Sequence, residues 1–357
     1  MTASDPPIQV ANGKRPGQPV WLLVLLAPLV AEFVSGNLPV TLLWLLVVYA
    51  PLYGGAALLI REASRRSLRP WPVVALLGLA YGVAEEAFLS GSLFNPTYAE
   101  LRLLDFGWIP ALGIGAWWTV FVVVLHLVWS IWVPIVLAES VAGDIAERPW
   151  LRRQGLLVAA LTTLFGAAAV AGLSLAEEGM TASVTQLVTA ALVVIALCLA
   201  AVAVGRRGPT PGGTDDVDRT PPSLLALVGA GATVGLVFLA GAAQQGPVAV
   251  TLGIYAVLLA SAPLLLRRWA RRPGWGSAQR LALATGVLIP HVGFALLWPP
   301  LLDVPVWISV ASDTVFTLAT AGFLLVAWRR QLTPKCDPQT LTVLSSRSPP
   351  SRGTASC

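Results

Sequence analysis

Residues 71–91 read WPVVALLGLAYGVAEEAFLSG, an apolar segment that is interrupted by two adjacent carboxylates, Glu85 and Glu86. At about 1.5 Å per residue, this segment is long enough to cross the roughly 30 Å hydrocarbon core of a bilayer. A charge at that depth costs more than about 2.5 kcal/mol on insertion scales. The segment therefore predicts a membrane helix inside a bundle whose other helices compensate the two acids.

The composition extends this prediction to the whole chain. The chain is 56% hydrophobic and 11% charged, whereas an average soluble domain is about 25% charged. Its apolar residues occur in runs of about 20, the length of a membrane-spanning helix. The sequence thus excludes a soluble multidomain protein and predicts an all-α, polytopic transmembrane bundle. The ten expected spans are Val20–Gly36, Leu38–Ile60, Trp71–Gly91, Leu112–Ala138, Gly155–Leu173, Thr185–Val204, Leu224–Ala243, Val248–Leu266, Leu281–Trp298 and Val306–Trp328.

The segments outside these spans are polar and rich in Pro, Gly, Ser and Thr, as is typical of linkers and disordered tails. We expect a disordered cytoplasmic arm (1–19), helices one to six (20–204), a cytoplasmic linker (205–223), helices seven to ten (224–328) and a disordered cytoplasmic tail (329–357).

The placement of Lys and Arg predicts the orientation. With a cytoplasmic N-terminus, 22 of the 23 basic residues fall on the cytoplasmic side, and Arg102 is the exception. Short cytoplasmic loops carry such an excess, so both termini are expected inside. The same placement argues against nucleic acid as a partner, despite the net charge of +5, and favours the lipid bilayer. The preference for Arg over Lys is typical of GC-rich bacterial genomes, so we expect the bacterial cytoplasmic membrane.

Ionisable residues inside the spans are the candidate functional groups. At about 1.5 Å per residue, five of them from five helices fall into one layer, from the bilayer midplane to its outer half. We therefore expect a polar pocket between helices three, four and nine. Adjacent residues of an α-helix are about 100° apart, so Glu85 and Glu86 are not expected to face the same centre. The six residues are Glu32, Glu85, Glu86, His126, His291 and Asp313.

Glycine and proline near these residues indicate how the helices pack. Gly78 and Gly82 form a GxxxG spacing one turn before the acids, which allows a neighbouring helix to approach closely. Pro290, directly before His291, predicts a kink, and kinked helices at membrane depth often line cavities. The cysteines have no spacing that suggests a disulfide framework or a metal cluster.

The stretch Glu85-Glu86-Ala-Phe-Leu-Ser-Gly resembles the first motif, Glu-Glu-x-x-x-Arg, of the CAAX-protease and bacteriocin-processing (CPBP) family of intramembrane proteases. The second motif, Phe-x-x-x-His, is approximated by Val122–His126, and the third, His-x-x-x-Asn, by His291–Ala295. This chain has Ser90 in place of the motif Arg, Val122 in place of Phe and Ala295 in place of Asn.

The resemblance implies an intramembrane peptidase with Glu85, Glu86, His126 and His291 as catalytic residues and a membrane peptide or protein as substrate. The first Glu would activate a water molecule, and the histidines would polarise it or bind the oxyanion. A Glu with two His could also hold Zn²⁺, but the chain lacks a His-Glu-x-x-His helix motif. We therefore predict no cofactor, although the residues leave a divalent metal open.

Two other functions are compatible with the same residues. A satisfied hydrogen-bond network between helices would make the protein a non-catalytic scaffold. Buried acids and imidazoles also build proton relays, which would make it a proton- or solute-coupled secondary transporter. In that case ten helices can form two inverted halves of five, with His126 and His291 as counterparts.

Overall fold

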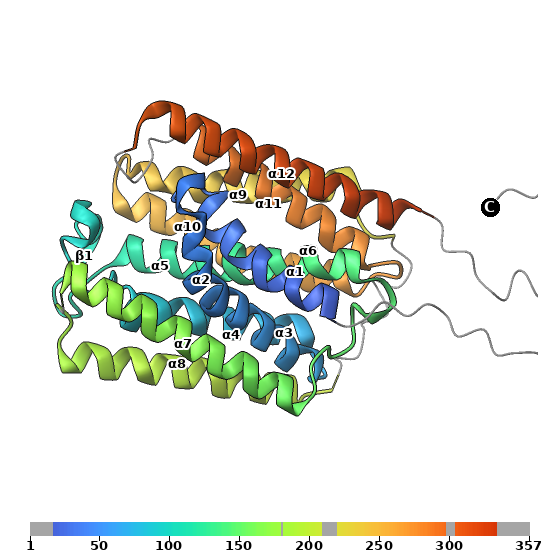
Figure 1. The fold of residues 1–357 in the computed structure, drawn as a ribbon, viewed down its shortest axis with the longest axis horizontal. Helices are drawn as coiled ribbons and strands as arrows, with labels where there is room; N and C mark the ends of the chain where they lie inside the picture. Colours follow the sequence, from blue (N-terminus) through green and yellow to red (C-terminus); the bar gives the residue numbers. More distant parts are fainter. Residues whose placement is uncertain (1–16, 180, 209–219, 298–303, 334–357) are drawn as a thin grey trace, which may run out of the picture.

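The computed structural model describes residues 17–179, 181–208, 220–297 and 304–333, and these ranges form a bundle of helices (Figure 1). Within them, nine helices are long and apolar enough to cross a membrane, and a shorter apolar helix covers Gly17–Phe33. The expected all-α polytopic bundle is thus confirmed. The expected arm and tail lie largely outside the described residues, as does the middle of the linker. The last helix continues to Leu332, four residues beyond its expected end at Trp328.

The first four apolar segments are numbered below as the first to fourth membrane helices. Each contains a π-helical turn, which is wider than an α-helical turn. The first is α1 (Gly17–Pro28) followed by the π-turn η1 (Leu29–Phe33). The second consists of η2 (Val40–Leu45), α2 (Leu46–Tyr49), the π-turn η3 (Ala50–Gly54) and α3 (Gly55–Arg65). The third is α4 (Pro70–Ala84) followed by the π-turn η4 (Glu85–Leu89). The fourth consists of α5 (Ala116–Leu125), the π-turn η6 (His126–Trp132), α6 (Val133–Ala142) and η7 (Gly143–Ile145).

The remaining membrane helices are more regular. They are α7 (Arg153–Glu178), α8 (Val184–Gly205), α9 (Leu224–Ala240), α10 (Val248–Ala270), α11 (Ser277–Leu297) and α12 (Val306–Leu332). A short 3₁₀ turn, η9 (Gly241–Ala243), follows α9. The loop after η4 contains η5 (Tyr98–Glu100) and two short antiparallel strands, β1 (Trp108–Ile109) and β2 (Ile114–Gly115), with Trp108 opposite Gly115.

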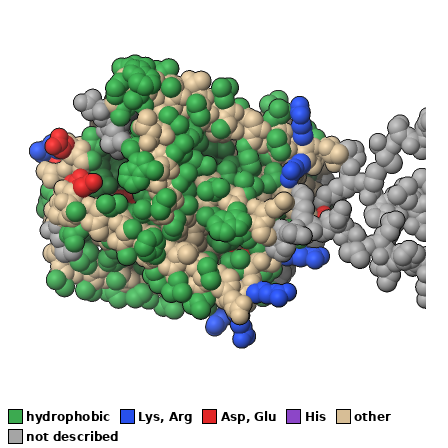
Figure 2. Space-filling view, viewed as in Figure 1, with side chains coloured by type: hydrophobic (Ala, Val, Ile, Leu, Met, Phe, Trp, Pro, Cys, Tyr) green, Lys and Arg blue, Asp and Glu red, His purple; other side chains and the backbone are tan. Residues whose placement is uncertain are grey.

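Burial separates central helices from peripheral ones. In the helix Ala116–Ile145, 72% of the most apolar window is buried inside the protein, whereas the corresponding share is 11% for α8 and for α10. Leu and Val side chains are exposed along the peripheral helices, and apolar side chains cover the face seen in Figure 2. Exposure of such an extended apolar surface to water is unfavourable, so this surface is suited to contact with lipid. The fourth membrane helix is therefore the axis around which the others pack.

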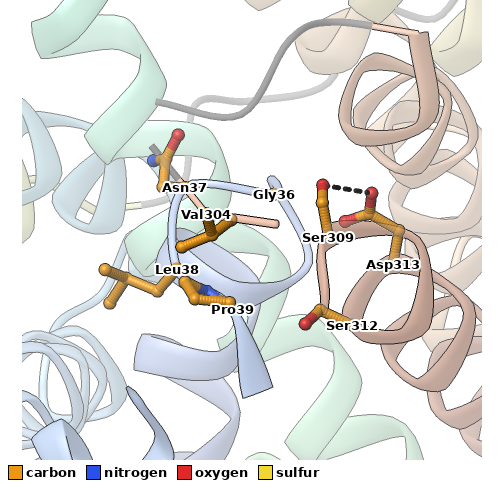
Figure 3. Close-up of a pocket in the computed structure, with 8 residues that line it drawn as sticks. All are labelled: Gly36, Asn37, Leu38, Pro39, Val304, Ser309, Ser312 and Asp313. Atoms are coloured by element: carbon orange, nitrogen blue, oxygen red, sulfur yellow. Dashed lines mark hydrogen bonds between the residues drawn. The ribbon is translucent and has the colours of Figure 1, made fainter. Parts of the chain in front are cut away.

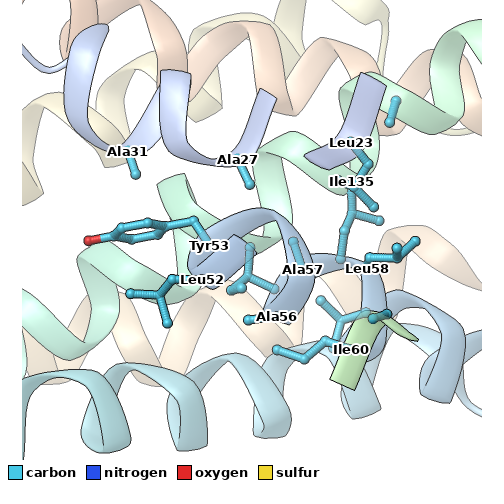
Figure 4. Packing of buried hydrophobic residues seen from close by; sticks show 14 of the residues in the cluster. Leu23, Ala27, Ala31, Leu52, Tyr53, Ala56, Ala57, Leu58, Ile60 and Ile135 are labelled. Atoms are coloured by element: carbon cyan, nitrogen blue, oxygen red, sulfur yellow. The ribbon is translucent and has the colours of Figure 1, made fainter. Parts of the chain in front are cut away.

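Small residues set the closest helix contacts. Gly231 of α9 faces α11 so closely that an added Cβ would lie 2.6 Å from the carbonyl oxygen of Leu283. Ala27 and Ala57 lie on the facing surfaces of α1 and α3, in a buried apolar cluster that also includes Leu23 and Ile135 (Figure 4). Backbones that approach this closely gain van der Waals contact, which drives helix association in membranes.

Arginine gathers at one end of the bundle, here called the arginine-rich end. Arg65 ends α3, while α10 and α12 carry two arginines each in their last turns. The arginine side chains drawn in blue lie mainly at this end in Figure 2. The chain after α3 and the last residue of α8 meet there, because Leu68 donates a backbone hydrogen bond to the carbonyl of Gly205 at 2.8 Å. The clustering is the charge pattern expected at the cytoplasmic ends of membrane helices.

A buried ion-pair network joins helices at this end. Arg61, which is 0% exposed, donates to Glu139 at 3.0 Å and to Glu62 at 2.7 Å, and its guanidinium lies 3.3 Å from the centre of the Trp150 ring. Arg65 donates to both carboxylate oxygens of Glu139. Glu139 follows Ala138, the expected end of the fourth span, and for that reason was not among the expected buried groups. These buried ion pairs hold α3 against α6, because each buried charge has a partner of opposite sign.

Candidate functional site

The two acids of the third membrane helix meet His126 of the fourth. Nε2 of His126 lies 2.7 Å from Oε1 of Glu86 and 3.1 Å from Oε2 of Glu85. The three residues are buried, with exposures of 4% for Glu85, 6% for Glu86 and 4% for His126. The structure thus brings together three residues that the sequence marked as candidates. They are called the acid–imidazole centre below.

The prediction that Glu85 and Glu86 face different directions is wrong. Both carboxylates reach the same imidazole nitrogen. The helix changes from α to π at Glu85, where Ser90 donates its backbone N–H to the carbonyl of Glu85 at 3.0 Å. A π-turn has more residues per turn, so successive side chains diverge by a smaller angle than in an α-helix. The long Glu side chains cover the remaining difference.

The GxxxG spacing brings the two helices together. At Gly82, an added Cβ would lie 2.9 Å from the carbonyl oxygen of Val123 and 3.2 Å from Cβ of His126. At Gly78, it would lie 2.6 Å from a methyl group of Leu127. The close approach that the sequence predicted therefore occurs against the helix that carries His126. It sets the distance at which the acids of η4 can reach the imidazole.

Glu86 is the better bound of the two acids. Its Oε1 is hydrogen-bonded to His126, and its Oε2 accepts hydrogen bonds from the hydroxyls of Ser90 (2.8 Å) and Ser92. The Ser92 hydroxyl in turn accepts a 2.9 Å hydrogen bond from the indole N–H of Trp118. Ser90 occupies the position at which the CPBP motif has Arg, so a neutral donor binds the carboxylate here.

Glu85 is bound less completely. Among the described residues, its Oε2 has no hydrogen-bond partner, although it lies 3.1 Å from Nε2 of His126. A ring nitrogen carries at most one proton, and the shorter contact directs that proton to Glu86. On the other side of the ring, Nδ1 of His126 lies 3.0 Å from the hydroxyl of Ser130, one turn further along the helix. The imidazole is thus oriented at both nitrogens, while one oxygen of Glu85 is left to bind something else.

Two tyrosines and a third acid surround the imidazole. The ring of Tyr53 lies nearly parallel to that of His126 with centroids 6.0 Å apart, and the ring of Tyr81 lies edge-on to it at 5.7 Å. The hydroxyl of Tyr53 donates a 2.5 Å hydrogen bond to Oε1 of Glu32. Glu32 is therefore part of the surroundings of the centre. The sequence did not mark either tyrosine, because tyrosine is common in membrane helices and only the contacts distinguish these two.

The acids of this group, the imidazole and Tyr53 all lie in π-helical turns, whereas Tyr81 lies in α4. Glu32 is in η1, Tyr53 in η3, the Glu pair in η4 and His126 in η6. The i→i+5 hydrogen bonds are present, for example from Val34 to Leu29 at 2.8 Å. Single π-turns occur frequently at functional sites, since they re-aim side chains at a cost in helix regularity. Four of them around one imidazole indicate a site that the fold is arranged to build.

His291 contacts neither acid of the centre. It is 1% exposed, its Nε2 lies 2.9 Å from the carbonyl oxygen of Val30, and its ring stacks on Trp129 with centroids 4.9 Å apart. Trp129 follows His126 by one turn, so the indole ring occupies the position next to the imidazole of His291. Within the described residues, Nδ1 of His291 has no hydrogen-bond partner. Of the residues expected to share a pocket between helices three, four and nine, the two acids and His126 are thus in contact, whereas His291 contacts Val30 and Trp129.

Asp313 lies at a different place. It lines a small cavity of about 10 Å³ with Ser309 and the loop 36–39 (Figure 3). The hydroxyl of Ser309 donates to the Asp313 carboxylate at 3.5 Å, and Ser312 accepts the backbone N–H of Val40 at 2.9 Å. The cavity has room for about one water molecule. Asp313 therefore belongs to the contact between α12 and this loop.

The acid–imidazole centre also has the composition of a metal site. One ligand atom each from Glu85, Glu86 and His126 lies within 4.8 Å of the others. Ligands at about 2.0 Å from a tetrahedral zinc ion are about 3.3 Å apart, and the 2.7 Å contact between His126 and Glu86 is shorter than that. The contact has the length of a charge-assisted hydrogen bond. A metal would have to separate these two groups slightly.

Fold and centre together define the class of this protein: a polytopic membrane protein with a buried acid–imidazole centre between its third and fourth membrane helices. A family model described as an uncharacterized membrane protein family matches residues 21–345, so the chain belongs to that family. No model of the CPBP family matches. No curated protein and no solved structure matches the chain.

Proposed function

We propose that this protein is an intramembrane peptidase of the bacterial cytoplasmic membrane, with both termini on the cytoplasmic side and Glu85 as its general base. The observation that supports this function best is the free carboxylate oxygen of Glu85, 3.1 Å from the imidazole that Glu86 and Ser130 hold in place. A water molecule beside that oxygen would have a base next to it and a charged or hydrogen-bonding imidazole close by, as acid–base catalysis requires.

The chemistry of peptide hydrolysis can be assigned to these groups. Glu85 takes a proton from the water, and the water oxygen forms a bond to the peptide carbonyl carbon. His126, held in its protonated form by Glu86, stabilises the carbonyl oxygen through its positive charge as that oxygen becomes negative. When the C–N bond breaks, Glu85 returns the proton to the leaving nitrogen. His291 has a positioning role in this mechanism, since its bond to Val30 holds α11 against η1.

Proton-coupled transport is the second candidate. It is supported by Glu32, which supplies a third carboxylate next to the centre through Tyr53. The side-chain amide of Asn37, in the loop after η1, lies 3.3 Å from the other oxygen of Glu32. Polar groups thus extend from the centre towards the loop that lines the Asp313 cavity. Acids and an imidazole in series are the groups from which membrane proton relays are built.

One reconstitution separates the two functions. The full-length protein in proteoliposomes is given a quenched-fluorescence transmembrane peptide of about 20 residues, and proton flux is recorded in parallel with a pH-sensitive dye. As a peptidase, the protein should cleave the peptide, and Glu85→Gln should lower turnover by about 100-fold or more. Asp313→Asn, which removes the carboxylate that lines the separate cavity at α12, should leave turnover unchanged.

If the protein is a transporter, the same reconstitution should show proton flux and no peptide cleavage. Solute-dependent proton flux without peptide cleavage, reduced by Tyr53→Phe as well as by Glu85→Gln, would replace the peptidase with a transporter. Cleavage that is unaffected by Glu85→Gln would remove Glu85 from the mechanism. If neither activity depends on Glu85, Glu86 or His126, the centre serves only to hold the helices together.

A further inference from the structure

A second feature lies apart from the acid–imidazole centre, at the arginine-rich end. A groove of about 170 Å³ lies between α3, α4 and α8. Arg66 and Ser67, directly after α3, and Arg206, directly after α8, line it at the arginine-rich end. The remaining lining is small or apolar and comes from Ala63, Val73, Leu77, Ala201, Val202 and Gly205. The groove therefore joins two guanidinium groups to an apolar strip.

The charges around the groove do not balance. Arg66 donates to a carboxylate oxygen of Glu62 at 2.7 Å, but Glu62 is also bound by Arg61. Glu139, the other acid of this network, is shared by Arg61 and Arg65. Three guanidinium groups thus share two carboxylates. Arg206 is exposed, and it forms no ion pair in the part of the chain that the structure describes. An excess of positive charge therefore faces the groove.

The apolar part of the groove opens towards lipid. Val202 is 48% exposed on α8, a helix whose surface is mostly unburied. Gly205 forms the narrow floor, because a Cβ there would lie 3.1 Å from Cβ of Ser67 and 3.1 Å from a methyl group of Val73. The volume is several times that of one water molecule, and its position at helix ends places it at headgroup depth. An occupant must therefore be anionic at one end and apolar at the other.

We propose that this groove binds the phosphate of an anionic phospholipid, with an acyl chain lying along α4 and α8. Arg206 and the exposed side of Arg66 contact the phosphate, and Val73, Leu77 and Val202 contact the first methylene groups of the chain. Basic pockets between membrane helices select anionic headgroups in this way, since the guanidinium fork matches phosphate oxygens. The site is independent of any activity of the acid–imidazole centre.

The chain offers a matched pair of variants for the test. Arg206→Gln and Arg207→Gln each remove one charge from adjacent exposed residues, but only Arg206 lines the groove. Val202→Trp fills the apolar part without a change in charge. The full-length protein in detergent is titrated with phosphatidylglycerol or phosphatidylcholine, and bound lipid is counted by native mass spectrometry. Size-exclusion chromatography and circular dichroism check that each variant is folded.

Phosphatidylglycerol should bind the wild type at least fivefold more tightly than phosphatidylcholine does. Arg206→Gln should weaken phosphatidylglycerol binding about fivefold, the effect of one arginine near an anionic headgroup, and Val202→Trp should also weaken it. Arg207→Gln should not. Equal losses for Arg206→Gln and Arg207→Gln would mean diffuse charge attraction and would overturn the site. Displacement of the lipid by millimolar inorganic phosphate would overturn the lipid as occupant in favour of a free anion.

Discussion

Glu86 and His126 are 40 residues apart in the chain and join two membrane helices through a 2.7 Å hydrogen bond between Oε1 and Nε2. Both groups lie where hydrocarbon surrounds the bundle, so neither can turn to water if the other is lost. Buried polar groups of this kind are held by their partners, and removal of one leaves the other uncompensated. The bond thus connects the stability of the bundle with the geometry of the candidate site.

Glu86→Gln should therefore affect the structure more than Glu85→Gln does. Glu86 binds His126, Ser90 and Ser92, whereas one oxygen of Glu85 has no hydrogen-bond partner in the described part of the chain. A lost charge-assisted hydrogen bond costs about 1.5–3 kcal/mol. Thermal unfolding in detergent should show a lower midpoint for Glu86→Gln and a smaller change for Glu85→Gln. The reverse order would contradict the assignment of Glu86 as the acid that orients His126.

Gly82→Ala should separate the third and fourth membrane helices. The new methyl group would lie 2.9 Å from the carbonyl oxygen of Val123, and forced overpacking typically costs about 1–3 kcal/mol. We expect a lower unfolding midpoint together with loss of whatever activity depends on His126. The control is Gly172→Ala on α7, where an added Cβ meets nothing within 4 Å. Equal effects of the two substitutions would indicate that helix propensity, and not this contact, decides the result.

Glu139→Gln should destabilise the arginine-rich end. It leaves Arg61 and Arg65 without the carboxylate that both of them bind, and breaking a buried pair costs about 3–5 kcal/mol. The matched control is Glu147→Gln, which removes the partner of Arg280 at the surface, where the carboxylate side chain is 69% exposed. Such pairs contribute about 0–1 kcal/mol. Denaturation of both variants in the same detergent measures the difference in stability. Similar losses of stability would show that the buried network does not hold α3 against α6.

The orientation can be tested with single cysteines in a background that lacks Cys198, Cys336 and Cys357. Glu100→Cys lies in the loop between the third and fourth membrane helices, and Glu147→Cys at the arginine-rich end; both positions are exposed. Because basic loops stay in the cytoplasm, a membrane-impermeant thiol reagent applied to whole cells should label Glu100→Cys only. Labelling of Glu147→Cys instead would invert the expected topology.

The candidate site could be predicted in part. Glu85, Glu86 and His126 stand out in the sequence because ionisable residues in apolar spans are costly and need a partner. Tyr53 and Ser130 do not, since neither residue type is unusual in a membrane helix. His291 and Asp313 have the same sequence signal as His126, yet they contact Val30 and Ser309. Depth along a helix can be counted from the sequence, but rotation about its axis and the choice of neighbour cannot.

The sequence by itself determined that this chain is a bundle of membrane helices, because apolar runs of about 20 residues have no other stable environment. It also marked the third and fourth helices, together with the first, ninth and tenth, as carriers of buried ionisable groups. Only the tertiary structure decided that both acids face one imidazole. That result depends on a π-turn at Glu85 and on which helix meets Gly82. The sequence predicted a close approach at Gly82 but neither the π-turn nor the partner helix, because both depend on packing between helices.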